Sequence, residues 1–93
     1  MTGKIAYLDN RAIVKRYVYE TGSEFIRAQY NDAYLGNVLL SFNVWNIEEV
    51  IGVFDRAHRQ KRITNKQLDQ VIGRFSNETA MLKKIRRIRI FTL

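Results

Sequence analysis

Two carboxylates, those of Asp9 and Glu49, occupy positions at which they could share a cation. Asp9 directly follows the apolar run Ile5–Leu8, and Glu49 lies about two turns into the helix expected after the run Val38–Phe42. Neighbouring carboxylates repel one another unless a cation holds them. Mg²⁺ and Mn²⁺ prefer such oxygen ligands, and either ion can activate water for attack on a phosphodiester. Asp9 and Glu49 are therefore candidate catalytic and metal-binding residues.

The same two residues also have an ordinary structural interpretation. An aspartate that follows a strand often caps the next helix through its side-chain oxygen. A glutamate on a helix is usually solvated. Spacing alone favours this structural interpretation over a metal site.

The hydrophobic pattern predicts the elements that must position these residues. Short apolar runs predict strands at Ile5–Leu8, Val38–Phe42 and Ile88–Leu93. Helical spacing predicts four helices, over residues 12–19, from Thr21 to Gly36, from Asn43 to about Gln60, and from Thr64 to Leu82. Residues 21–24 and 64–67 each match a capping box, and Asn43 is a good N-cap. Strands separated by helices imply right-handed crossovers and a parallel sheet with helices on its faces. Ligands bind at the carboxyl ends of such strands, where Asp9 lies.

Positive charge is concentrated in the second half of the chain. The net charge is +7; residues 1–55 hold five Lys/Arg and seven Asp/Glu, whereas residues 56–93 hold eleven and two. Such asymmetry favours a polyanionic partner such as nucleic acid, although a surface tuned for solubility explains it equally well. The candidate nucleic-acid-binding residues are Arg56, Arg59, Lys61, Arg62, Lys83, Lys84, Arg86 and Arg87.

Length and composition narrow the class of protein further. The chain has 93 residues and is expected to form one domain. It contains no cysteine, which excludes a disulfide framework and a thiol nucleophile. No apolar run is long enough to cross a membrane, and the first residues do not resemble a secretory signal. We therefore expect a cytoplasmic protein without a membrane partner.

Several segments resemble PIN-domain ribonucleases. The run from Ile5 to Tyr17 is similar to the opening of that family, where a strand ends in Asp and an apolar helix ends in a Lys/Arg-Tyr pair. The segment from Val38 to Val53, which contains Glu49, resembles the second motif of the family. Residues 59–63 resemble its middle region, and residues 82–93 resemble its third strand. The likeness covers the N-terminal two thirds of a typical PIN domain.

The resemblance implies a fold, an activity and partners. The fold would be a three-layer α/β arrangement in which a short parallel sheet, with strand order 3-2-1, is flanked by helices. Asp9 and Glu49 would hold Mg²⁺ or Mn²⁺ in an endoribonuclease site of the toxin–antitoxin (VapC) type, with RNA as substrate and an antitoxin protein as partner. The chain departs from the family at Asn10 and Arg11, where Thr or Ser and a small residue are usual, and at Asn43, where Ser is usual.

The later acidic motifs of the family have no counterpart in residues 1–93. We therefore expect a single truncated PIN-like domain with an incomplete site, and with weak or no nuclease activity. The alternative is a non-catalytic, truncated or engineered PIN-like scaffold that serves as an oligomerisation or nucleic-acid-binding module. Without later strands the apolar segment Ile5–Leu8 becomes a sheet edge, which predicts a homodimer or higher oligomer joined by antiparallel pairing of these strands.

Overall fold

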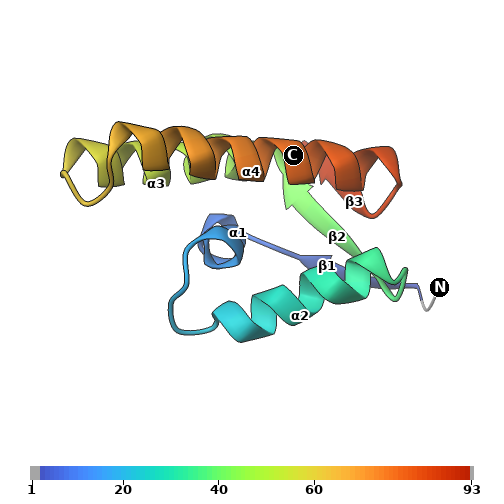
Figure 1. Ribbon diagram of the computed structural model, residues 1–93. Helices are drawn as coiled ribbons and strands as arrows, with labels where there is room; N and C mark the ends of the chain where they lie inside the picture. Colours follow the sequence, from blue (N-terminus) through green and yellow to red (C-terminus); the bar gives the residue numbers. More distant parts are fainter. Residues whose placement is uncertain (1–2, 93) are drawn as a thin grey trace.

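All seven predicted elements are present, in the predicted order (Figure 1). The structure is a computed structural model and describes residues 3–92. The elements are β1 (Lys4–Tyr7), α1 (Asn10–Tyr17), α2 (Ser23–Tyr34), β2 (Val38–Asn43), α3 (Val44–Arg59), α4 (Asn65–Lys84) and β3 (Ile88–Phe91). The last strand ends at Phe91, and the predicted strand residue Leu93 lies outside the described residues.

The three strands form one parallel sheet with β2 in the middle. Ile5 lies opposite Leu39, and Leu40 lies opposite Ile88. The predicted strand order, 3-2-1, is confirmed, since it is the observed order read from the other edge. The carboxyl ends of all three strands consequently meet at one edge of the sheet, above which Asp9 follows β1.

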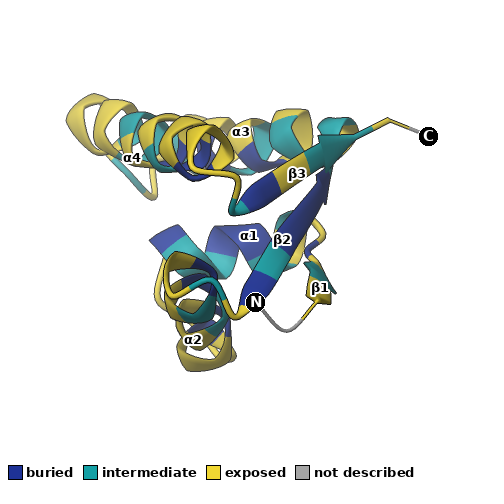
Figure 2. Cartoon of the chain, turned by 90° about the vertical axis from the view of Figure 1, so that its right-hand side faces the viewer, coloured by how far each residue is buried: buried dark blue, intermediate teal, exposed yellow. Residues whose placement is uncertain are grey.

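The predicted third layer is absent from residues 3–92. α1 packs against α2, α3 and α4, and the ring of Tyr17 on α1 meets Phe75 on α4 edge to face, with the ring centroids 5.6 Å apart. All four helices therefore lie on the same side of the sheet, as Figure 2 shows. The expectation of helices on both faces is wrong here because both crossovers move in the same direction with the same hand, which places both helix pairs on one face.

The core lies between the sheet and the helices. Val38, Leu40 and Phe42 alternate along β2 and are all buried, which identifies the inner face of the sheet. Each such side chain contributes roughly 1.5–3 kcal/mol when it is fully buried. The helices supply the other large buried side chains, which are Ile13, Tyr30, Phe54, Phe75 and Leu82.

Two of the predicted helix caps are confirmed and one is wrong. Asn43 caps α3, and Thr64 caps α4 through a capping box with Gln67. The expected capping box at Thr21 does not form, since α2 begins at Ser23. The Ser23 hydroxyl accepts a hydrogen bond from the Glu20 N–H at 2.8 Å and donates to the Val18 carbonyl at 3.2 Å. The Ser23 side chain therefore closes the turn before the helix instead of capping it.

Candidate functional site

Asp9 caps helix α1, which is the structural role that its position after a strand suggested. Its Oδ1 atom accepts a hydrogen bond from the backbone N–H of Ala12 at 2.9 Å and so caps α1. The side chain is exposed, and Oδ2 makes no hydrogen bond to other residues within 3–92. One carboxylate oxygen is therefore engaged in the fold, and the other is available to a ligand.

Glu49 is positioned by the residues that begin α3. Its Oε1 atom accepts from the Asn46 side-chain amide at 3.3 Å. Asn46 in turn accepts from the backbone N–H of Asn43 at 3.0 Å, as part of the cap of that helix. The capping box thus orients the amide that contacts the Glu49 carboxylate.

A shallow hollow of about 370 Å³ lies at the carboxyl ends of the strands. Asp9 and Asn46 both line it, and Glu49 is hydrogen-bonded to Asn46. Of the two predicted ligands, Asp9 borders the hollow directly, whereas Glu49 is connected to it only through Asn46. The other lining residues are Tyr7, Leu8, Ala12, Ser41, Asn43 and Phe91.

The donor set at this edge fits a hydrated ion better than an ion enclosed by protein. Residues 3–92 contain no group of three or more His, Cys, Asp or Glu side chains that could hold a metal. Mg²⁺ is often held by only one or two carboxylates, together with water and substrate phosphates. Asp9 and Glu49 could supply those carboxylates. Arg89 opposes a cation here, because its guanidinium donates to the hydroxyl of Ser41, which lines the same hollow.

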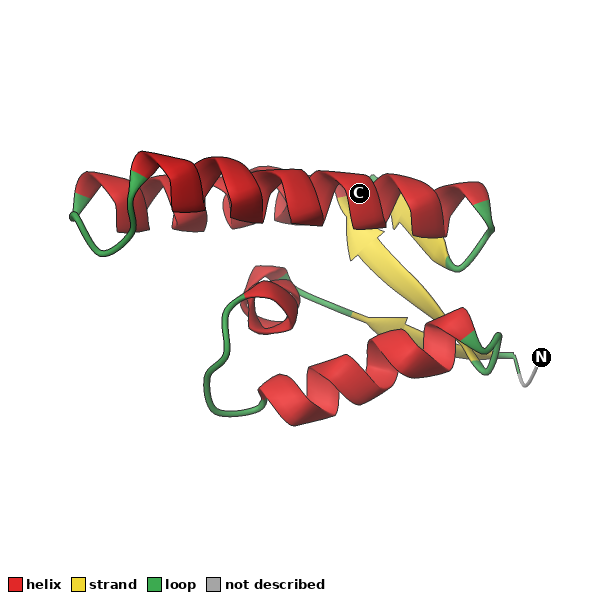
Figure 3. Cartoon of the chain, viewed as in Figure 1, coloured by secondary structure: helices red, strands yellow, loops and turns green. Residues whose placement is uncertain are grey.

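The predicted nucleic-acid-binding residues form two groups, each around one of the two turns that flank α4, and Figure 3 shows these turns at opposite ends of that helix. One group surrounds the turn between α3 and α4, and the other surrounds the turn between α4 and β3. Residues 65–82 of α4 lie between them, which corresponds to about 27 Å of helix. The first group is Arg56, Arg59, Lys61 and Arg62, and the second is Lys83, Lys84, Arg86 and Arg87.

The members of these two groups differ in how much they contact other residues of the fold. Arg59 forms an ion pair with Asp55 at 3.2 Å on the surface of α3. Arg87 is half-buried, and its Nε atom is buried without a hydrogen bond within the described residues. Its guanidinium also lies against Gly36, where an added Cβ would come within 3.4 Å of Nη2. Arg87 is therefore partly a packing residue, whereas Lys83, Lys84 and Arg86 are exposed.

The carboxylate with the most hydrogen bonds was not among the predicted site residues. Glu78 of α4 accepts two hydrogen bonds from Arg16 of α1, at 2.9 and 2.8 Å. It also accepts from the hydroxyls of Tyr17, at 2.9 Å, and Tyr34, at 2.7 Å. One side chain thus ties α1, α2 and α4 together. A sequence signal was present, because Glu78 is three residues after Phe75 and four before Leu82, on the apolar side of its helix.

The surroundings of Glu78 determine its charge state. Burial raises the pKa of Glu78, but the hydrogen bonds from Arg16, Tyr34 and Tyr17 outweigh burial, and the net effect lowers the pKa. The hydrogen bond to Glu78 raises the pKa of Arg16. Burial and the bond to Glu78 raise the pKa of Tyr34 to about 12. The cluster is therefore a charged pair with neutral tyrosine donors, which is a structural arrangement rather than a poised acid or base.

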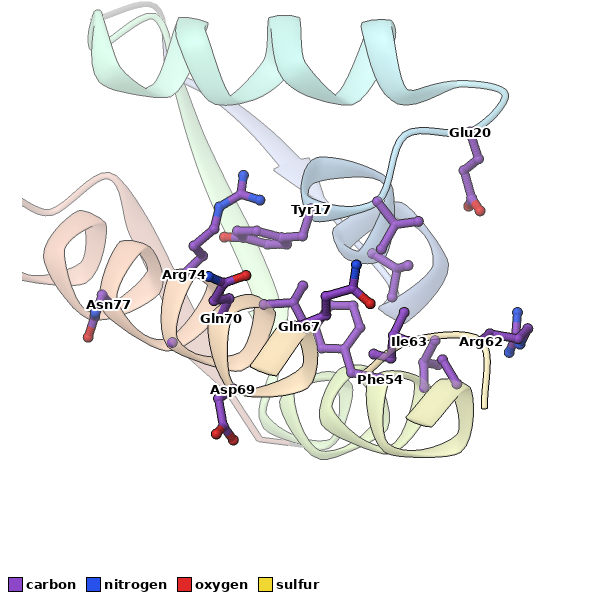
Figure 4. A pocket seen from close by; sticks show the side chains of 16 residues that line it. Tyr17, Glu20, Phe54, Arg62, Ile63, Gln67, Asp69, Gln70, Arg74 and Asn77 are labelled. Atoms are coloured by element: carbon purple, nitrogen blue, oxygen red, sulfur yellow. The ribbon is translucent and has the colours of Figure 1, made fainter. Parts of the chain in front are cut away.

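A groove of about 920 Å³ runs between α1, α3 and α4 (Figure 4). Tyr17 and Phe54 point into it, whereas Asp69 and Asn77 point away. The guanidinium of Arg74 lies 5.7 Å from the ring centroid of Tyr17 at its margin. The groove is lined by apolar side chains together with polar and charged ones, among them Glu20, Arg62, Gln67 and Arg74.

No protein-family model, curated protein or solved structure matches this chain. Among the described residues, none of the helices combines the length and apolarity that crossing a membrane requires. The resemblance to PIN domains therefore stays a prediction from the sequence motifs around Asp9 and Glu49.

Proposed function

We propose that this chain is a PIN-like, nucleic-acid-binding domain with part of a Mg²⁺- or Mn²⁺-dependent endoribonuclease site. The observation that carries the proposal is the placement of Asp9 and Asn46 around one hollow, with Glu49 hydrogen-bonded to Asn46. A divalent ion, when bound there, would activate water and stabilise charge on a phosphate. The predicted antitoxin partner remains a prediction.

The residues of this edge have limited capacity for catalysis on their own. Asp9 and Glu49 each have one oxygen engaged in a protein hydrogen bond, so a bound ion would depend on water and on substrate phosphate for its remaining ligands. We therefore expect weak metal affinity, and slow cleavage or none. The two basic groups would hold the RNA backbone, and binding would weaken steeply as salt rises because phosphate contacts release counterions.

Asp9→Asn tests the metal site without removing the helix cap, because Asn caps helices as well as Asp does. Mn²⁺ binding is measured by the loss of free Mn²⁺ signal in electron paramagnetic resonance, and cleavage is measured with a labelled single-stranded RNA. We expect Asp9→Asn to abolish Mn²⁺ binding and any metal-dependent cleavage. Asp69→Asn, which changes an exposed acid on α4 outside this edge, is the matched control and should change neither. Equal Mn²⁺ affinity in all three proteins would remove the metal site from the proposal.

The alternative function, a non-catalytic oligomerisation module, is favoured by the exposed edge of the sheet. Within residues 3–92, β1 pairs with β2 and with no other strand, and its residues Ile5 and Tyr7 are 42% and 64% exposed. Two copies that paired their β1 strands across a two-fold axis would run antiparallel and form one sheet of six strands. The two Asp9 residues would then lie at opposite ends, so the dimer would not complete the acidic site.

Ile5→Pro tests this pairing. The Leu8 N–H donates to the Ser41 carbonyl on β2, so by alternation the Ile5 N–H points to the open edge. Proline removes that donor while leaving the bonds to β2, whereas Ile5→Val keeps it. Light scattering should show a dimer for the wild type and Ile5→Val, and a monomer for Ile5→Pro. A monomeric wild-type protein at micromolar concentration would contradict the alternative.

A further inference from the structure

The outer face of the sheet carries an aromatic and cationic surface that the helices leave uncovered. Tyr7, Ser41 and Arg89 lie opposite one another in a row across the three strands. The Arg89 guanidinium lies 5.9 Å from the ring centroid of Tyr7 and 5.7 Å from that of Phe91. The two rings meet edge to face, 6.2 Å apart. We use the name sheet platform for Tyr7, Arg89 and Phe91.

Hydrogen bonds hold the platform in place. Arg89 donates to the Ser41 hydroxyl from Nε at 3.3 Å and from Nη2 at 3.2 Å. Ser41 is only 1% exposed, although it is on the outer face, because the neighbouring side chains cover it. Tyr7 is 64% exposed above this layer. The guanidinium and the rings are thus ordered by the sheet, and Tyr7 still presents most of its surface to solvent.

We propose that the sheet platform binds single-stranded nucleic acid, with unpaired bases stacking on Tyr7 and Phe91 and a phosphate contacting Arg89. Aromatic rings on a sheet face, here the exposed ring of Tyr7 and the half-buried ring of Phe91, can stack unpaired bases of any sequence. A guanidinium binds phosphate through several donors. Arg89 is the charged residue among the outward-facing strand positions, which are Ile5, Tyr7, Leu39, Ser41, Asn43, Arg89 and Phe91. Asp9 borders the same hollow as Tyr7 and Phe91 at one end of this face, so we expect the phosphate to lie on the Arg89 side of the platform.

A second copy of the chain fits this face less well. Face-to-face packing of two sheets would bury Arg89 of both copies, and no outward-facing strand position supplies a carboxylate for it. Asp9, which borders the hollow, already has one oxygen engaged in the cap of α1. Burying a charge without an opposite charge carries a large desolvation cost. Nucleic acid supplies both the anion and flat apolar surfaces, which is why we favour it over a protein partner.

The experiment measures binding of a fluorescein-labelled single-stranded RNA, about twelve nucleotides long, by fluorescence anisotropy at low salt. EDTA is present throughout, so the result does not depend on the proposed metal site. We expect Tyr7→Ala and Phe91→Ala each to weaken binding about tenfold or more, because each removes a stacking surface. Tyr7→Phe keeps the ring and should bind nearly as well as the wild type.

Tyr19→Ala is the matched control. Tyr19 is 67% exposed and has its own arginine partner, Arg27, at 5.3 Å, but it lies outside the sheet. Its loss should leave RNA affinity unchanged. Duplex RNA of the same sequence should bind more weakly than the single strand, because its bases are already stacked on one another.

Three results would overturn the proposal. They are unchanged affinity in Tyr7→Ala and Phe91→Ala, equal binding of duplex and single strand, and conversion of an oligomer to a monomer by these variants without loss of RNA binding. The last result would assign the face to a protein interface. If circular dichroism shows that a variant is unfolded, ultraviolet crosslinking of the wild type decides instead. A crosslink at Tyr7 or Phe91 supports the platform, and crosslinks confined to other residues overturn it.

Discussion

Glu78 and the pair Asp9 and Glu49 show two different uses of a carboxylate in one small domain. Both oxygens of Glu78 accept hydrogen bonds, from Arg16 and two tyrosines that lie on two other helices. Asp9 and Glu49 each use one oxygen for a neighbour three residues away in their own segment. A carboxylate whose oxygens are occupied by protein donors has little capacity left for a ligand. The exposed pair therefore remains the candidate for binding, and Glu78 is the carboxylate on which the packing of the helices depends.

Removing Glu78 should have the largest effect on stability. Glu78→Ala leaves Arg16 without its anion and leaves the hydroxyls of Tyr17 and Tyr34 without their acceptor. We expect a loss of roughly 2–3 kcal/mol in the free energy of unfolding, measured by urea denaturation. Glu49→Ala, an exposed glutamate, should change that free energy by no more than about 0.5 kcal/mol. Similar losses in the two variants would erase the distinction between the two regions.

Lowering the pH should remove part of the stability that the ionised Glu78 carboxylate provides. The pKa of Glu78 is lowered in the folded state, so its contribution to stability is present above the unfolded value of about 4.3 and is lost as pH falls through the folded value. We expect the stability gap between wild type and Glu78→Gln to be widest near neutral pH and to narrow below about pH 4. Urea titrations of both proteins across the acid range measure it. A gap that does not depend on pH would mean that the ionised form of Glu78 gives no advantage over a neutral amide.

Asp9 should matter less to stability, and its effect should depend on the replacement. Asp9→Ala removes the acceptor for the Ala12 N–H and should lower the unfolding free energy by about 1 kcal/mol. Asp9→Asn keeps the cap and should stay within about 0.5 kcal/mol of the wild type. Thermal unfolding of both variants separates the capping role of Asp9 from its proposed metal role. Equal stability in the two variants would show that the cap contributes nothing.

The smallest expected effect concerns a basic residue that the backbone holds in a strained conformation. Lys61, at the end of α3, has φ of +60°, in the left-handed region that favours glycine. Lys61→Gly should raise the unfolding free energy by roughly 0.5–1 kcal/mol, and it should weaken RNA binding slightly by removing a charge. Denaturation and anisotropy measure the two effects. Lys61→Ala removes the charge but keeps the strain, so it should weaken binding without the gain in stability.

Local features of the sequence were sufficient to predict the elements and most of their limits. The caps at Asn43 and Thr64 need only a side-chain oxygen and an N–H two or three residues away, so they form wherever the segment is helical. The apolar runs of β1, β2 and β3, separated by helices, likewise predicted a parallel sheet, whereas its order, with β2 in the middle, was predicted from the resemblance to PIN domains. The capping box at Thr21 failed because Ser23 competes for the same backbone turn.

The sequence by itself determined the elements, their order and the edge of the sheet at which Asp9 lies. Only the tertiary structure decided which distant polar side chains meet: Arg16 with Glu78, 62 residues apart, and Arg89 with Ser41, 48 residues apart. It also decided that all the helices cover one face, which leaves Tyr7 exposed on the other. The physical reason is the separation along the chain over which each kind of interaction acts. Caps and periodicity act within one or two turns of the chain, whereas these contacts depend on how packed helices and strands bring distant residues together.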